Sequence, residues 1–241
     1  MKINRKSYLH QLVFLPGTFP VNCYLIEEDD SLTLIDAGLP HSYKGIQQAE
    51  AKLGKPLTRI ILTHVHSDHV GSLDTLVQLY PGIEVYVSRR DARLMNGDLS
   101  LDVDEAQTPI KGSVPKKLQT RPTQLLEDGD LVGSLQVIAV PGHTPGSIAL
   151  LDTRNQFVIA GDALQTRGGI AVAGDVRLFF PFPAMATWSK ADALQSAQKL
   201  LHLQPALLAI GHGDMIEQPV QAMQRAIQQA ASQWNIQLSL S

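Results

Sequence analysis

Residues 64–69 place four side chains that commonly bind metal ions within six consecutive positions. The segment is His64-Val65-His66-Ser67-Asp68-His69. Three imidazoles this close together would repel one another once protonated, and burying them with a carboxylate without a compensating cation would cost several kcal/mol. The spacing therefore predicts a metal site rather than a polar loop that contains histidines by accident.

The residues on either side of this segment indicate how it is positioned. Residues 59–63 are mostly apolar, as in a buried strand, and the apolar residues of 70–77 fall at helical spacing. The four candidate ligands are therefore predicted to lie in the turn between a strand and a helix. Such loops at strand ends are where rigid scaffolds present functional groups.

Three later segments share the same arrangement, an apolar strand that ends in a turn with one ligand-type residue beside glycine. The candidate ligands in these turns are His143, Asp162 and His212. Glycine beside each ligand lets the backbone turn sharply and approach a metal closely. A single histidine after a strand is more often structural, but three such turns together with residues 64–69 predict one ligand set.

Seven ligands are too many for one tetrahedral zinc ion and suit two. Asp162 has two carboxylate oxygens and could bridge the pair. Nitrogen-rich ligation without thiolate favours two Zn²⁺ ions, with Mn, Fe, Co or Ni as alternative occupants.

The seven residues resemble the ligands of the metallo-β-lactamase superfamily of dinuclear hydrolases, and the resemblance covers nearly the whole chain. The family motif His-x-His-x-Asp-His matches residues 64–69, and the later His, Asp and His match the residues in the three later turns. The resemblance implies two ligand sets joined by a bridging Asp162: His64, His66 and His143 for one ion, and Asp68, His69 and His212 for the other.

The resemblance also implies a fold and a supporting residue. The expected fold is α/β, a four-layer αββα sandwich that forms a single domain over residues 1–241. Asp36, in the segment Ile35-Asp36-Ala37-Gly38, looks like the family's early aspartate, whose carboxylate orients a ligand histidine without binding the metal.

The hydrophobic pattern agrees with layers of sheet and helix, because apolar runs alternate with segments of helical spacing. Helices are expected at 42–53, 70–80, 187–203 and 220–234, and strands at 22–26, 32–35, 60–63, 83–87, 135–140, 148–151, 157–160 and 206–210. Residues 89–130 contain three prolines and no sustained period. Part of this stretch is expected to cap the active site, and the alternative is a surface excursion or short helices.

Composition excludes several classes of protein. The formal net charge is −3 and Lys and Arg form no long run, so neither a nucleic-acid partner nor a membrane surface is expected. No apolar run approaches the ~18–20 residues of a membrane span, and no signal-length apolar run follows the N-terminus. The prediction is a cytoplasmic protein. The one cysteine, Cys23, is expected to be a buried apolar residue rather than a nucleophile.

The expected reaction is hydrolysis of a small carboxylic ester or lactone by a hydroxide that bridges the two metal ions and attacks the carbonyl carbon. Asp68 or Asp162 would pass the proton to the leaving group. An apolar rim for the substrate is predicted from Phe179, Phe180 and Phe182, with Gln165 near it. The alternative is that these phenylalanines belong to the core or to a contact in a homodimer.

Other activities stay open on the sequence alone. They are thioester hydrolysis as in glyoxalase II, phosphoester or phosphotriester hydrolysis, β-lactam hydrolysis, a sulfur dioxygenase-like reaction at a single iron, and a non-enzymatic scaffold. Only about one helix follows His212, which disfavours the glutathione-binding domain of glyoxalase II. True β-lactamases lack the bridging aspartate, and acyl-homoserine lactonases have tyrosine where this chain has Gln165. The complete ligand set disfavours the single-iron enzyme and the scaffold.

Overall fold

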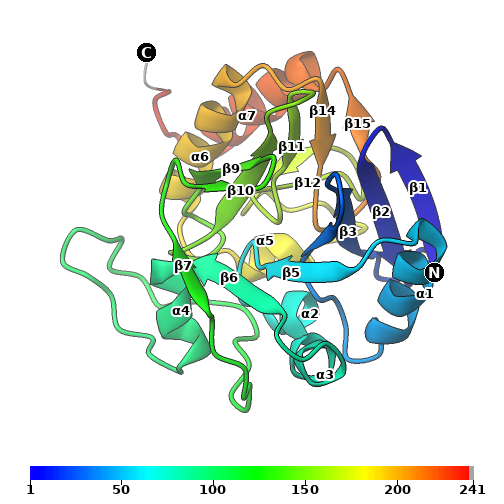
Figure 1. Cartoon of the computed structure of the whole chain (residues 1–241). Helices are drawn as coiled ribbons and strands as arrows, with labels where there is room; N and C mark the ends of the chain where they lie inside the picture. The colour runs from blue at the N-terminus through cyan, green and yellow to red at the C-terminus, as the bar shows by residue number, and fades with distance from the viewer. Residues whose placement is uncertain (239–241) are drawn as a thin grey trace. The chain divides into compact units, whose positions relative to one another are not determined.

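The computed structural model describes residues 1–238, which form two compact units. The first unit contains residues 1–99 and 113–126, and the second contains residues 100–112 and those from 127 onward. Each unit is built on one large sheet with helices (Figure 1). Among residues 1–238, no helix combines the length and apolar character needed to cross a membrane.

The sheet of the first unit has seven strands in sequence order. They are β1 (Lys2–Lys6), β2 (Leu9–Phe14), β3 (Val21–Glu27), β4 (Leu32–Ile35), β5 (Leu57–Ile61), β6 (Glu84–Ser88) and β7 (Gln124–Leu126). Strands β1 to β4 pair antiparallel, and β4 to β7 pair parallel. All residues of β4 are buried, as expected for a strand covered on both faces.

Four helices belong to the first unit: α1 (Tyr43–Leu53), α2 (Ser67–Val70), α3 (Leu73–Leu79) and α4 (Arg89–Met95). Helix α1 buries Ile46 and Ala49 and ends at Gly54, which adopts the left-handed conformation that favours glycine. Figure 1 shows α1, α3 and α4 along one side of this sheet.

The helix expected at 70–80 is wrong in its limits, because two short helices replace it. Gly71 separates α2 from α3, and a Cβ at this position would lie 2.7 Å from the carbonyl oxygen of Gly38. The Ser72 hydroxyl donates to the Leu39 carbonyl (2.5 Å). This close approach of the two backbones interrupts the helix. Asp68 and His69 lie in α2 and not in an open turn.

The sheet of the second unit has the strand order β15-β14-β11-β10-β9-β8. Its strands are β8 (Leu131–Val132), β9 (Leu135–Ala139), β10 (Ile148–Asp152), β11 (Phe157–Ile159), β14 (Leu207–Ala209) and β15 (Ile216–Glu217). Among these six strands, β11 and β14 form the parallel pair, and the other neighbours pair antiparallel. A separate hairpin consists of β12 (Leu164–Gln165) and β13 (Ala171–Val172).

Helices α5 (Phe182–Ala186), α6 (Lys190–His202) and α7 (Val220–Trp234) complete the second unit. Leu200 of α6 and Met223 of α7 are fully buried in a cluster with Val158 and Leu208 from the strands. The two longer helices therefore share one apolar core with the sheet whose strands lead to the candidate ligands His143, Asp162 and His212.

Residues 89–130 are less irregular than expected, since they include α4, β7 and part of each unit. In the second unit, the Trp188 indole donates to the Thr108 carbonyl (2.9 Å). In the first unit, the Asp74 carboxylate accepts from the backbone of Thr120 (2.8 Å). The segment is thus hydrogen-bonded to the rest of its unit at Thr108 and at Thr120, and its role as a cap stays a prediction.

Cys23 is buried in β3. Burial, reinforced by the nearby carboxylate of Asp36, raises the pKa of its thiol well above the ordinary value. A thiol in this environment stays protonated, which agrees with the expected packing role and disagrees with a nucleophile.

Candidate metal centre

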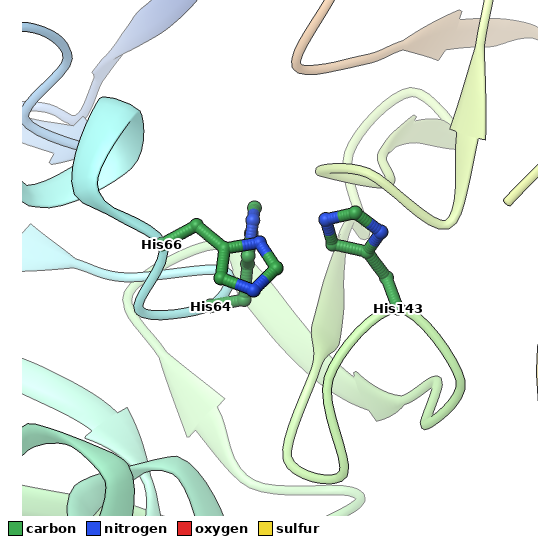
Figure 2. Close-up of side chains that lie close together, drawn as sticks. All are labelled: His64, His66 and His143. Carbon is green, nitrogen blue, oxygen red and sulfur yellow. The ribbon is translucent and has the colours of Figure 1, made fainter. Parts of the chain in front are cut away.

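The first unit carries four of the candidate ligands in one cluster. His64 follows β5, His66 precedes α2 as its N-cap, and Asp68 and His69 lie within α2. The three histidines are buried, and Asp68 is partly exposed. Figure 2 shows the imidazoles of His64 and His66 beside each other, with ring centroids 4.9 Å apart. Ligand atoms of His64 also lie within 4.8 Å of those of His69.

A buried aspartate fixes the orientation of His69. Asp36 Oδ2 lies 2.8 Å from His69 Nδ1. An ionised carboxylate is an acceptor only, so Nδ1 carries the proton and donates it. The lone pair of His69 is then on Nε2, the ring atom toward Asp68 Oδ2 at 4.0 Å. This is the arrangement expected of a carboxylate that supports a metal-binding histidine.

Thr63 links the same aspartate to His64 and fixes the tautomer of that histidine. Its backbone N–H donates to Asp36 Oδ1 (2.8 Å), and its hydroxyl donates to Asp36 Oδ2 (2.7 Å). The hydroxyl oxygen lies 3.1 Å from His64 Nδ1 and, because its hydrogen is already committed, it accepts from that nitrogen. One carboxylate thereby directs the Nε2 lone pairs of two histidines.

Two further contacts hold the ligand segment in place. The buried Asp91 of α4 accepts from the backbone N–H of Val65 (3.2 Å). The hydroxyl of Ser67, the first residue of α2, donates to the carbonyl of Ser113 (2.7 Å), 46 residues later in the chain. The sequence pattern did not identify Thr63 or Asp91, because neither residue type nor spacing signals these roles.

The second unit carries the other three candidate ligands, also in one cluster. His143 lies on the loop after β9 (Figure 2), and Asp162 and His212 follow β11 and β14. All three are buried. Asp162 Oδ2 lies 3.4 Å from His143 Nε2 and 3.1 Å from His212 Nε2. One carboxylate oxygen therefore faces two imidazole nitrogens.

A threonine also fixes the tautomer of His143. The Thr187 hydroxyl donates to the Pro183 carbonyl (2.8 Å), and its oxygen lies 3.2 Å from His143 Nδ1. His143 Nδ1 therefore donates, and its Nε2 lone pair faces the Asp162 carboxylate. Two acceptors that face each other in a buried site repel unless a proton or a cation lies near both. The cluster thus fits a metal ion in the chemistry of its donors.

Strand register places two of these ligands side by side. In the parallel pair of β11 and β14, Ile159 is opposite Ala209. Asp162 and His212 each come three residues after these partners, so equal turns carry them to the same edge of the sheet. The similar sequence patterns after the two strands therefore place two candidate ligands at one edge of the sheet.

Gly142, beside His143, is required for a different reason from the one expected. Its φ is +140°, and a Cβ there would lie 2.3 Å from the backbone nitrogen and 2.4 Å from the Cα of Ala193 in α6. The Ser189 N–H also donates to the Gly142 carbonyl (2.9 Å). This glycine lets the ligand loop pack directly against the start of a helix.

The residues predicted for the substrate rim differ sharply in exposure. Phe180 is 1% exposed, and its ring centroid lies 5.3 Å from that of His212. Phe179 is 90% exposed, and Phe182 is half exposed and contacts Phe180 edge to face. Gln165 is buried, and within residues 1–238 its side-chain oxygen accepts no hydrogen bond.

Comparison with known proteins connects the two clusters to one family. Residues 16–212, which extend across both units, match the family model of the metallo-β-lactamase superfamily. The chain is 57% identical over 230 residues to the uncharacterized protein YobT of Bacillus subtilis (strain 168), covering 95% of this chain and 99% of that protein. It is 32% identical over 216 residues to the probable metallo-hydrolase YflN of the same organism, covering 80% of each chain.

Solved structures give the same result for the fold. The structure matches TTHA1623 in a di-iron-bound form with a TM-score of 0.65 and 27% identity, over 88% of this chain and 96% of that one. It matches the DIM-1 metallo-β-lactamase exposed to ceftazidime with a TM-score of 0.71 and 14% identity, over 96% of this chain and 97% of that one. The predicted fold class is confirmed by these matches.

Proposed function

Because the chain belongs to the metallo-β-lactamase superfamily, we propose that it is a metal-dependent hydrolase whose two ligand clusters form one dinuclear centre. The ligand sets would be those that the family motif implies: His64, His66 and His143 for one ion, Asp68, His69 and His212 for the other, and Asp162 for both. Two zinc ions suit these nitrogen-rich sets. The di-iron-bound form of TTHA1623 makes iron the first alternative to test.

The observation that carries this proposal is the common orientation of three imidazoles. His64, His69 and His143 each direct Nδ1 toward a threonine or aspartate oxygen. Each therefore presents Nε2 within its own cluster, where a metal would be bound. Histidines that only pack in a core would not need three separate hydrogen bonds that select the same tautomer.

When bound, two divalent ions would supply a nucleophile from water at neutral pH and an electrophile for a carbonyl oxygen. The chain's own contribution is to hold the imidazoles rigidly through Asp36, Thr63 and Thr187, and to provide a proton carrier. The Asp68 side chain is 25% exposed, whereas that of Asp162 is 4% exposed. Asp68 is therefore the better candidate to pass a proton to a leaving group that departs into solvent.

The substrate that we propose is a small carboxylic ester or lactone with an apolar portion. Phe180 and Phe182 would contact that portion beside His212. The buried side-chain oxygen of Gln165 would accept a hydrogen bond from a polar group of the substrate, since burial without a partner is costly. Phe179 and Leu178, both 90% exposed, are better placed for a homodimer contact or the outer rim.

The test is metal analysis of the purified protein combined with a substrate panel. The panel contains a γ-lactone, an acyl-homoserine lactone, a nitrophenyl ester, a glutathione thioester, a β-lactam and a phosphotriester, each with and without chelator. We expect two metal ions per chain and chelator-sensitive turnover of the ester or a lactone. Fully metal-loaded protein that turns over only the thioester, the β-lactam or the phosphotriester would overturn the ester and lactone assignment.

A matched pair of variants links turnover to the site. His212→Ala removes a proposed ligand, whereas His202→Ala removes an exposed histidine at the end of α6 in the same unit. We expect the first to lose both metal and activity and the second to retain both. Full metal content and turnover in His212→Ala would contradict the proposed ligand set.

A further inference from the structure

The second unit contains a cavity that none of the seven ligands lines. Its volume is about 660 Å³, within the range of small-molecule sites. It is lined by Ala106, Thr108, Lys111, Trp188, Ser189, Lys190, Ala191, Gln233, Trp234 and Ile236. The chain has two tryptophans, and both are among these residues. The cavity is thus the place where the two indoles of the chain converge.

Contacts among three separate segments hold the walls of this cavity in place. The Trp188 indole donates to the Thr108 carbonyl (2.9 Å), and the Thr108 hydroxyl donates to the Trp188 carbonyl (3.3 Å). Trp234 is the last residue of α7, and the Lys190 ammonium lies 5.1 Å from the centroid of its ring. Trp188 is therefore oriented by hydrogen bonds before any ligand arrives, which lowers the entropic cost of binding.

The charge of the lining is positive. Lys111 and Lys190 contribute ammonium groups, and no Asp or Glu is among the lining residues. Asp175 is a buried carboxyl group that interacts electrostatically with Lys190 and lies outside the lining. Burial raises the pKa of Asp175, although Arg177 and Lys190 oppose the shift. An apolar cavity with two ammonium groups attracts a ligand that combines an apolar body with a negative charge.

We propose that this cavity is a second binding site, for a small aromatic carboxylate. The aromatic ring would pack against the indoles of Trp188 and Trp234, where offset or edge-to-face geometry is favourable. The carboxylate would pair with Lys111 and Lys190. The proposal uses none of the metal ligands, so it stands or falls independently of the proposed hydrolase activity.

A ligand in this cavity would affect the position of the loop that carries His143. The backbone N–H of Trp188 donates to the carbonyl of His143 (3.1 Å), and that of Ser189 donates to the carbonyl of Gly142 (2.9 Å). Two residues that line the cavity, Trp188 and Ser189, are therefore hydrogen-bonded to the turn that carries His143. A ligand that shifts Trp188 would shift this turn as well.

The test is a titration of intrinsic tryptophan fluorescence with phenylacetate, with phenylacetamide as the neutral comparison. Both fluorophores line the cavity, so the signal reports on it directly. We expect saturable binding of phenylacetate, with the amide weaker by about tenfold, as for the loss of one charge-assisted interaction. No saturable change with phenylacetate, or equal binding of the amide, would overturn the proposal.

Variants separate this cavity from other binding modes. Lys190→Gln and Lys111→Gln, on different segments, should each weaken phenylacetate. Lys44→Gln is the matched control, because its ammonium also lies over an aromatic ring, that of Tyr43 (5.9 Å), in the first unit. His66→Ala should leave phenylacetate binding unchanged; if it abolishes binding, the carboxylate binds at the metal centre and the proposed site is refuted. Equal weakening by Lys44→Gln would refute it too.

Discussion

Replacement of Asp36 by asparagine should weaken metal binding without altering the shape of the first ligand cluster. Asp36 has a φ of +60°, a conformation that asparagine also tolerates. Its carboxylate accepts three hydrogen bonds, from the Thr63 backbone (2.8 Å), the Thr63 hydroxyl (2.7 Å) and His69 Nδ1 (2.8 Å). The asparagine oxygen can keep the hydrogen bond from the Thr63 backbone at the Oδ1 position, and the amide nitrogen then takes the place of Oδ2 and faces both His69 Nδ1 and the Thr63 hydroxyl.

The consequence for His69 is a change of tautomer. An amide N–H that points at His69 Nδ1 requires a lone pair on that nitrogen, which moves the ring proton to Nε2. The nitrogen that would bind the metal is then protonated. Loss of such a supporting group costs about 10–100-fold in metal affinity, or about 1.4–2.7 kcal/mol. We expect a loss in this range for the Asp36→Asn protein.

The assay is a competition titration of the metal-free protein against a chromophoric chelator. Asp152→Asn is the matched control, because Asp152 is also a buried carboxylate with a short ion pair, to Arg154 (2.7 Å). It lies opposite Leu135, at the end of β10 remote from the loop of His143. Wild-type affinity in Asp36→Asn, or an equal loss in Asp152→Asn, would refute the reasoning.

Three further predictions concern stability, measured by urea unfolding. Gly142→Ala should lower the free energy of unfolding by about 1–3 kcal/mol more than Gly129→Ala, because both positions have positive φ but only the first meets the backbone of α6; equal losses would contradict the close approach. Leu200→Ala should cost about 2–5 kcal/mol, since the residue is fully buried in the core of the second unit, and a loss below this range would mean that the core refills the cavity. Asp74→Asn should destabilise at neutral pH, and this destabilisation should shrink progressively as the pH is lowered below about 4: burial opposes the shift, but hydrogen bonds from the Thr120 hydroxyl and two backbone amides lower the pKa of Asp74, so its contribution is present above the unfolded pKa and is lost as pH falls through the folded pKa. An effect that is the same at neutral and acid pH would show that the carboxylate charge contributes nothing.

The parts of this protein that were predictable from sequence are those with a strong local signal. Helix α7 matches the expected range 220–234, because its apolar residues repeat at helical spacing. The turns after β11 and β14 were expected from apolar runs that end in glycine and one ligand-type residue. Family resemblance then supplied the grouping of ligands that spacing alone left open.

The parts that were missed depend on tertiary contacts or lack a hydrophobic period. Strand β1 was not expected, because it is an edge strand whose residues are mostly exposed and include Lys2, Arg5 and Lys6. Thr63 and Thr187 were not identified, because a hydroxyl that fixes a tautomer has no sequence signature. The neighbours Phe179 and Phe180 are 90% and 1% exposed, a contrast that a loop without periodicity does not encode.

The arrangement of strands in the second unit also indicates where the chain should tolerate an inserted segment or a label. His143, Asp162 and His212 all follow the same edge of the sheet, whereas the connection at 153–156 joins β10 to β11 at the opposite edge. Most of this connection is exposed. A fluorescent label or an inserted epitope placed there would be separated from the ligand turns by the full length of the strands.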